Sequence, residues 1–356
     1  MTLDRRRWLG LSTAAGLASL MSPLSTWAAD AAPRAALLLP LTGGSADLAL
    51  SMTRAAALAQ PADRKQPEFL VLDTGGTAEG AALATGRAVA GGIGLIMGPV
   101  FAAEVGSVVT AAAGLPVLAF SNDAAVRDTG AFSLGITASQ GVSAILAYAR
   151  SRGIRRVAVL TDAEAWSVQS LTAARAHASR IGVEIFEADI TSLPGAGEGL
   201  AGQLSTASGG SLPDAVLACR SDPATIELCG RIVELGIQLL GPSSWSEGTG
   251  AVLGTVEGAW FAAPDPAAFA SFAQTYEARH SSAPGLLAAL AFDAAGIARR
   301  LDAAGRVSRD GLLAPEGFQG ALGAVRFTAD GGCARELAIQ VVSQGTTRVV
   351  ARATGQ

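Results

Sequence analysis

The stretch "GLIMGPVFAAEVGSVVTAAAGLPVLAFSND", Gly94–Asp123, decides the fold. It holds two short apolar runs, Leu95–Met97 and Val117–Phe120, on either side of an Ala/Val-rich segment of helical length, Ala102–Ala113. Short and almost continuous apolar strands separated by helices are typical of a parallel sheet that is covered on both faces. This stretch therefore predicts a buried strand, a helix and a second buried strand.

The same alternation extends along the chain and predicts an α/β protein with two similar lobes, each a doubly wound parallel sheet. The intervening segments are too long and too helical for a β-sandwich. Strands are expected over Ala35–Leu39, Phe69–Leu72, Leu95–Met97, Val117–Phe120, Val157–Leu160, Val183–Phe186, Ala215–Ala218 and Ile237–Leu240. Helices are expected over Ala46–Ala59, Thr77–Ala90, Ala102–Ala113, Gly141–Arg152, Val168–Ile181 and Pro223–Leu235.

The chain is expected to cross between the lobes at Gly130–Gln140 and at Val256–Pro266, where the strand and helix rhythm breaks. Several crossings predict a hinge of several strands. Lobe 1 is assigned to residues 34–134 plus 265–325, and lobe 2 to residues 135–264 plus 326–352. After the second crossing, two helices are expected over Ala267–Arg279 and Pro284–Ala303, and a hairpin joins Leu337–Val342 to Thr346–Val350.

The composition supports a large buried core and excludes one class of partner. The length of 356 residues is enough for two domains. Half of the residues are hydrophobic and 16% are charged, so a large core can form. The formal net charge is -4 and no run of basic residues occurs, whereas tight binding to a phosphate backbone needs several clustered Lys or Arg side chains. We therefore expect no nucleic-acid partner.

The N-terminal segment has the features of an export signal, assigned to residues 1–28. Arg5–Arg7 precedes an uncharged run, Trp8–Met21, and small residues follow near Ala28. A positive region, a short apolar region and a small-residue cleavage site are typical of a cleaved signal peptide. The order Arg-Arg-x-Trp-Leu also fits a twin-arginine signal, so the export route is left open. The mature protein is expected to be soluble in the periplasm.

The three cysteines form no C-x-x-C pair, so they predict neither a zinc site nor a redox motif. Three buried free thiols, at Cys219, Cys229 and Cys333, are the first expectation. A Cys219–Cys229 disulfide is the alternative in an oxidising compartment. No Cys lies near the expected cleavage site, so no lipid anchor is predicted.

Catalytic motifs are missing from the sequence. It contains neither a G-x-x-x-x-G-K-[ST] loop nor a G-x-S-x-G elbow. The two histidines, His177 and His280, lie in helix-like segments, where a solvated position is expected rather than a general base or a metal ligand. The sequence therefore predicts no enzyme, no metal and no cofactor.

Polar or turn-forming residues follow most of the predicted strands. In open parallel sheets, ligands bind at the carboxyl ends of the strands, where helix N-termini present free amides. Asp, Ser and Thr are also ordinary helix caps, so these residues indicate where a ligand would lie. The strand ends are Pro40–Ser45, Asp73–Thr77, Gly98–Pro99, Ser121–Asp123, Thr161–Asp162 and Arg220–Asp222.

From Pro33 to Val350 the sequence resembles the leucine-binding-protein-like family. The most specific segments are "GP…LPVLAFSND", within Gly98–Asp123, and "GFQGALGAVRF", Gly317–Phe327. "LLLPLTGG", "VLDTGGTAEGA", "VEGAWFAAPDP" and "AFDAAGIARRL" occur in the family's order around them. Within the family, the chain is similar to members likened to the lipoprotein activators of penicillin-binding proteins.

The resemblance implies a type I periplasmic-binding fold that closes on a small polar ligand, often an amino acid. The carboxylate of the ligand is expected at the loops after the third and fourth strands. In the loop after the third strand, Phe101-Ala102-Ala103 stands where the resemblance implies hydroxyl side chains, so only backbone amides are left there. Trp166 would cover the ligand, and the ammonium group of the ligand would pair with either Asp162 or Glu247. The expected ligand-binding residues are Gly44, Ser45, Phe101, Ala102, Ser121, Asn122, Asp162, Trp166 and Glu247.

Two functions are consistent with this resemblance. The first is a monomeric periplasmic receptor that delivers its ligand to an ABC permease. The alternative is a regulator of a peptidoglycan synthase, with a penicillin-binding protein as its partner and no need for a ligand-filled cleft. The missing hydroxyls at Phe101–Ala103 favour the regulator, whereas the lack of a lipid-anchor Cys favours the receptor.

Overall fold

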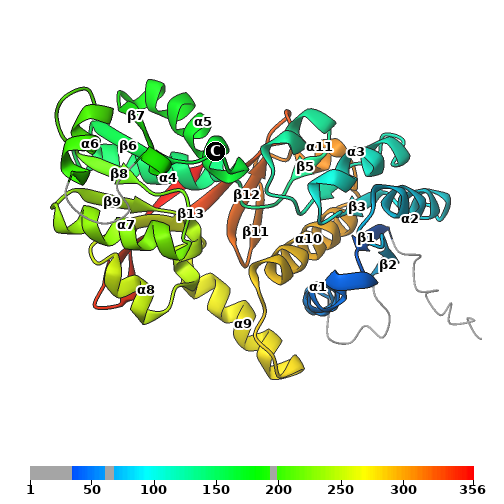
Figure 1. The fold of residues 1–356 in the computed structure, drawn as a ribbon. Coiled ribbons are helices and arrows are strands. Elements are labelled where there is room, and N and C mark those ends of the chain that lie inside the picture. The colour runs from blue at the N-terminus through cyan, green and yellow to red at the C-terminus, as the bar shows by residue number, and fades with distance from the viewer. Residues whose placement is uncertain (1–33, 61–67, 193–198) are drawn as a thin grey trace, which may run out of the picture. The chain divides into compact units, whose positions relative to one another are not determined.

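The computed structural model describes residues 34–60, 68–192 and 199–356, and Pro33–Gln356 forms one compact unit built on two sheets (Figure 1). The predicted signal peptide, residues 1–28, lies outside the described residues. Within them, no helix is long and apolar enough to cross a membrane.

The first sheet has five parallel strands in the order β2-β1-β3-β4-β5. All residues of β1, Ala35–Leu39, are buried because β1 has a strand on each side and helices on both faces. This burial explains why β1 is apolar throughout. The other strands are β2 (Phe69–Asp73), β3 (Leu95–Met97), β4 (Val117–Ala119) and β5 (Phe132–Ser133).

Helices cover the two faces of the five-stranded sheet. Leu37 and Leu39 share a core with α1 and α10, whereas Leu38 shares a core with α2 and α3, because alternate residues of a strand point to opposite faces. The four helices are α1 (Ala46–Leu58), α10 (Leu286–Ala303), α2 (Ala78–Ala90) and α3 (Ala102–Ala111).

The second sheet has the order β11-β12-β13-β10-β9-β8-β6-β7, and β14 pairs with β13. Its parallel part, β10-β9-β8-β6-β7, repeats the order of the first sheet, while β13 runs antiparallel to β10. The parallel strands are β6 (Arg156–Thr161), β7 (Glu184–Asp189), β8 (Ala215–Leu217), β9 (Gln238–Gly241) and β10 (Trp260–Ala263). The others are β11 (Phe318–Gly320), β12 (Gly323–Phe327), β13 (Cys333–Ser343) and β14 (Thr346–Gly355).

Helices also cover both faces of the second sheet. One core contains α4 and α5, and the opposite core contains α6, α7 and α8. These helices are α4 (Ala138–Ser151), α5 (Ala165–Ile181), α6 (Leu200–Ala207), α7 (Pro223–Glu234) and α8 (Gly250–Thr255). The remaining helical segments are α9 (Pro266–His280), α11 (Arg309–Leu312) and the short 3-10 helices η1 (Gly43–Ser45), η2 (Ala124–Thr129), η3 (Ile190–Ser192) and η4 (Ser243–Glu247).

The doubly wound α/β architecture predicted from the sequence is confirmed, with differences at the ends of elements. Helix α4 begins at Ala138 and not at the predicted Gly141, because Thr137 and Gln140 form a capping box at its start. The sequence analysis did not assign α6 or the β11–β12 hairpin. The lobe boundaries proposed from the sequence remain a proposal.

A buried ionic network ties α10 to the β11–β12 turn, to β13 and to the segment that follows β5. Arg335 of β13 is fully buried and donates hydrogen bonds from Nη1 to the Leu322 carbonyl (3.1 Å) and from Nη2 to the Leu134 carbonyl (2.7 Å). Asp293 of α10 accepts from the backbone N–H groups of Ala321 (2.6 Å) and Leu322 (3.2 Å). Burial raises the pKa of Asp293 to about 6, although the charge of Arg335 opposes this rise.

Candidate functional site

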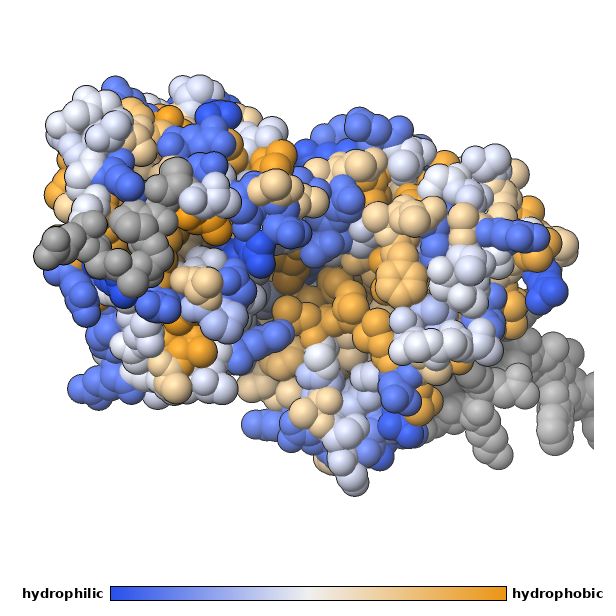
Figure 2. Space-filling view, viewed as in Figure 1, coloured by the Kyte–Doolittle hydropathy of each residue, from blue (hydrophilic) through white to orange (hydrophobic). Residues whose placement is uncertain are grey.

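A cavity of about 820 Å³ lies at the carboxyl ends of strands from both sheets. Figure 2 shows the molecular surface hollowed near its centre, with hydrophobic surface along one side. A cavity of this size is ordinary for a small-molecule site, which is on the order of 300–1,000 Å³. Its position is the one at which ligands bind open parallel sheets, so it is the candidate functional site.

One side of the cavity, here called the apolar wall, comes from the five-stranded sheet, its helices and the segment after β5. Leu48 belongs to α1, the leucines at 286, 287 and 290 belong to α10, and Phe101 precedes α3. The side chain of Phe101 is 36% exposed, so a large apolar surface faces the open cavity. The apolar wall consists of Leu48, Val100, Phe101, Phe120, Ile136, Leu286, Leu287 and Leu290.

The other side, here called the polar wall, comes from the segments that follow β6, β8 and β9. Sheet order places the end of β8 between the ends of β6 and β9, so side chains from three sequence regions meet there. The polar wall consists of Glu164, Trp166, Arg220, Ser221, Asp222, Ser243, Ser244 and Glu247.

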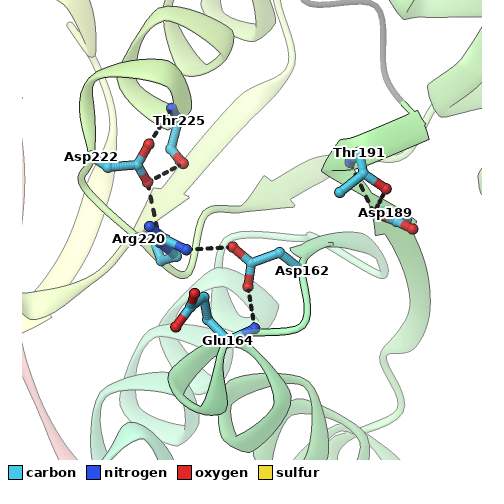
Figure 3. A network of polar contacts seen from close by, with 7 residues as sticks. All are labelled: Asp162, Glu164, Asp189, Thr191, Arg220, Asp222 and Thr225. Atoms are coloured by element: carbon cyan, nitrogen blue, oxygen red, sulfur yellow. Dashed lines mark hydrogen bonds and ion pairs between the residues drawn. The ribbon is translucent and has the colours of Figure 1, made fainter.

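Arg220, which follows β8, is held between two carboxylates (Figure 3). Its Nη1 lies 2.7 Å from Asp162 Oδ2, and its Nε lies 3.2 Å from Asp222 Oδ2. Asp162 also accepts from the backbone N–H of Glu164 (3.0 Å), and Asp222 caps α7 through Thr225. These contacts fix the guanidinium within the chain's own network.

The network lowers the pKa values of the two aspartates and raises that of the arginine. Burial opposes ionisation of Asp162 and Asp222, but hydrogen bonds, together with the charge of Arg220, outweigh it and leave both pKa values below the usual range. The hydrogen bond with Asp162 is the main cause of the raised pKa of Arg220. All three groups are therefore charged at neutral pH, and the positive charge of Arg220 is already balanced.

The start of α3 carries a carboxylate of its own. Glu104, in the first turn, is 1% exposed, and its Oε1 accepts from Thr74 Oγ1 at 3.0 Å. A hydrogen bond from the backbone N–H of Phe101 also reaches this carboxyl, while burial raises its pKa. Glu104 thus occupies one of the amides that the sequence analysis had reserved for a ligand carboxylate.

The structure brings five of the nine predicted ligand-binding residues to the cavity and leaves four outside its lining. Phe101, Ser121, Asn122, Trp166 and Glu247 line it. Gly44 and Ser45 lie in η1, Ala102 is the exposed first residue of α3, and the carboxylate of Asp162 is bound to Arg220. Whether the lining residues bind a ligand stays a prediction.

Sequence reasoning missed most of the apolar wall and three of the eight residues of the polar wall. The leucines of α10 belong to a helix that is apolar along much of its length, so no local signal separates those that face the cavity from those in the core. Glu164, Ser243 and Ser244 follow predicted strands and could have been found by extending the strand-end argument beyond Asp162 after β6 and to the end of β9.

The three cysteines are free and buried, and no Cys219–Cys229 disulfide is formed. Cys219 lines the cavity but is only 5% exposed. Burial raises the pKa of Cys219 and of Cys229 to about 12, so both are thiols and not thiolates at neutral pH.

We expect none of the three thiols of the folded protein to react with a small aromatic disulfide reagent at pH 8. Because only the thiolate attacks such a reagent, burial and a raised pKa both slow the reaction. Release of the coloured thiol should reach three equivalents only after unfolding in denaturant. One rapid equivalent from the folded protein would contradict this burial, and fewer than three after unfolding would indicate a disulfide.

The sequence and the fold were compared with those of known proteins. The sequence model of a family described as periplasmic binding protein matches residues 33–346. No protein of the curated set matches the chain.

Several solved structures share the fold at low sequence identity. A protein from Rhodospirillum rubrum, provisionally assigned as a branched-chain amino acid ABC transporter, has a TM-score of 0.71 and 20% identity over 89% of this chain and 99% of its own. The leucine-binding protein LivK from Thermotoga maritima has a TM-score of 0.58 and 20% identity over 90% and 98%. The C-domain of LpoA from Haemophilus influenzae, a regulator of PBP1A, has a TM-score of 0.67 and 16% identity over 89% and 99%.

Proposed function

This chain belongs to the periplasmic binding protein family, and from that premise we propose that it is the periplasmic receptor of an ABC uptake system. It binds one small ligand in the cavity between the apolar and polar walls and presents it to a permease, acting as a monomer. The observation that carries the proposal is the cavity of about 820 Å³ at the carboxyl ends of both parallel sheets.

The crossings between the proposed lobes support a closing movement. The chain passes from β5 to α4 and from β10 to α9, and the third proposed crossing, at residues 325–326, falls within β12, so the lobes are joined by several short segments. A ligand that contacts both walls gains more contacts in the closed state, and this difference in affinity is what drives closure. The segment assigned as a signal peptide, residues 1–28, would place the receptor in the periplasm.

A thermal-shift screen tests the proposal. The protein is unfolded, washed free of co-purified ligand and refolded, then heated with amino acids, amides, amines, aromatic acids and muropeptide fragments. A ligand present at a hundred times its Kd stabilises the folded state by about 2.7 kcal/mol and should raise Tm by about 5–10 °C.

Two matched variants show whether a hit occupies the cavity. Leu287→Trp adds a larger side chain to the apolar wall and should abolish the shift, whereas Leu83→Trp, at a 60% exposed position of α2, should keep it. No shift from any compound, with the protein correctly refolded, would count against the receptor function.

A second function is favoured by one feature of the cavity and by one similar structure. The apolar wall leaves large side chains accessible at the cavity, and the LpoA C-domain, a regulator of PBP1A, shares the fold. If the screen is silent, a regulator of a peptidoglycan synthase becomes the better proposal. Co-purification with a penicillin-binding protein, lost on Phe101→Asp, would then support it.

A further inference from the structure

We infer that the ligand of this cavity is an amphipathic cation, with an apolar body against the apolar wall and a protonated or quaternary amine facing Glu164 and Glu247 of the polar wall. The inference rests on the proposed receptor function and names its substrate class. It differs from the amino acid implied by the sequence resemblance, because a zwitterion also needs a place for a carboxylate.

The apolar wall has no charged group to offer. Among the residues that line this side of the cavity, the only polar side chains are Ser121 and Asn122. Ser121 is 5% exposed, and its Oγ already accepts a hydrogen bond from the backbone N–H of Asp123 at 3.1 Å. An apolar group of the ligand would therefore gain most by packing here, where it removes hydrocarbon surface from water.

A ligand carboxylate is disfavoured at the start of α3. Phe101, Ala102 and Ala103 offer no hydroxyl group there, and the carboxyl of Glu104 already takes the backbone N–H of Phe101. Glu104 itself is buried in the first turn of α3, outside the cavity lining, so the start of α3 offers a ligand carboxylate no side-chain donor.

The polar wall has an excess of negative charge. Its one guanidinium, Arg220, stands against the three carboxylates of Glu164, Asp222 and Glu247 and binds a fourth, that of Asp162 outside the cavity lining, so the local sum is +1 minus 4, or -3. Arg220 is engaged by Asp162 and Asp222, which leaves a ligand anion little to gain.

The carboxylates left for a ligand are those of Glu164 and Glu247. Both residues are exposed and line the cavity, and neither forms an ion pair with a described residue. Figure 3 shows that Glu164 joins the network through its backbone and not through its carboxylate. The charge of Glu164 also contributes to the raised pKa of Arg220, which leaves Glu247 the less engaged of the two, and both charges would attract a cation that enters the cavity.

Trp166 adds an aromatic surface beside these charges. It follows Glu164 by two residues at the start of α5 and lines the same cavity. An aromatic face attracts ammonium groups, and the combination of carboxylates and aromatic rings is common in sites for quaternary amines. The apolar wall, the two glutamates and Trp166 thus all favour a ligand with an apolar body and a positively charged amine.

Isothermal titration calorimetry with probes of one body and different heads tests the inference. Phenethylamine, phenethyl alcohol, 3-phenylpropionate and phenylalanine share a phenyl ring on a short chain. We expect phenethylamine to bind at least about tenfold more tightly than 3-phenylpropionate and phenylalanine. Raising NaCl from about 50 to 500 mM should weaken amine binding and hardly change alcohol binding.

Charge-removing variants locate the ammonium group. The double variant Glu164→Gln/Glu247→Gln should weaken phenethylamine binding by about tenfold, because each lost pair between a glutamate and the ammonium costs about three- to fivefold in affinity. The affinity for phenethyl alcohol should not change. Glu277→Gln, at an exposed position of α9 outside the cavity lining, serves as the matched control and should bind like the parent.

The possible outcomes separate this inference from the receptor function. Tighter binding of 3-phenylpropionate or phenylalanine overturns the cationic ligand but supports a receptor. Amine binding that is equal in the double variant and in Glu277→Gln overturns the assigned carboxylates. If no probe binds, the cationic ligand is rejected for this body size, and the wide thermal-shift panel decides separately whether the receptor function is rejected as well.

Discussion

Arg335→Met should lower the free energy of unfolding by about 3–5 kcal/mol at pH 7, the largest stability loss that we predict for a single substitution. Arg335 is fully buried and is hydrogen-bonded to the carbonyls of Leu134 and Leu322. Met keeps most of the volume but leaves both carbonyls without this donor. It also leaves the buried carboxyl of Asp293 without its positive neighbour.

The loss should depend on pH in a defined direction. The pKa of Asp293 is about 6 in the folded protein and about 3.8 without burial. Between these values the folded state binds more protons than the unfolded state, so the contribution of Asp293 to stability falls as pH rises. Without the opposing charge of Arg335, the pKa of Asp293 in the folded protein rises further, and the pH range over which stability falls extends upward. The destabilisation by Arg335→Met should therefore be smaller at pH 5 than at pH 7.

Urea unfolding followed by tryptophan fluorescence at pH 5 and pH 7 measures this difference. Arg306→Met is the control, because Arg306 forms an exposed pair with Glu316 at 3.4 Å and should matter by less than about 1 kcal/mol at either pH. Arg335→Lys keeps the positive charge, so its free energy of unfolding should lie between those of Arg335→Met and Arg306→Met. A stability of Arg335→Met equal to that of Arg306→Met would contradict a structural role for the network.

Gly241→Ala should cost about 3 kcal/mol, since one methyl group would collide with a buried ring. A Cβ at Gly241, the last residue of β9, would lie 2.0 Å from Cζ3 and 2.1 Å from Cε3 of Trp245. Trp245 is 1% exposed and packs edge-on against Phe261 at a centroid distance of 6.2 Å, so the ring has little room to move. The backbone of η4 would have to shift instead.

This substitution should also weaken ligand binding, because η4 carries Ser243, Ser244 and Glu247 of the polar wall. Tm and the affinity for the best hit of the thermal-shift screen measure both effects. Gly254→Ala is the matched control: nothing lies within 4 Å of its Cβ, and Ala in α8 should be neutral or stabilising by up to about 1 kcal/mol. Equal Tm values for the two variants would mean that Trp245 is not confined as described.

The sequence predicted the elements of the fold because the signals for them are local. The run of apolar residues at Ala35–Leu39 indicates a strand that is buried on both faces, and its helix-length neighbours require parallel pairing. Strand ends could be predicted from Gly98-Pro99 and Ser121–Asp123, where turn-forming and polar residues stop the apolar runs. Such ends locate the site along each strand, and Phe101, Ser121, Asn122 and Trp166 do line the cavity.

The chemistry of the cavity depends on contacts between distant segments. Asp162 and Glu247 were equal candidates for an ammonium partner in the sequence, but Asp162 binds Arg220, 58 residues away, and Glu247 has no ion-pair partner among the described residues. Glu104 could not be distinguished from an exposed helix residue until the fold placed Thr74 beside it.

By itself, then, the sequence determined most of the strands and helices, the parallel part of each sheet and the edge at which a ligand would lie, because hydrophobic periodicity and turn residues act over a few positions. Only the tertiary structure decided which walls meet across the cavity, which carboxylates are already neutralised and which side chains remain for a ligand. Those properties arise largely from side chains that lie far apart in the sequence, such as Leu48 and Leu290 or Asp162 and Arg220, and no local pattern encodes their meeting.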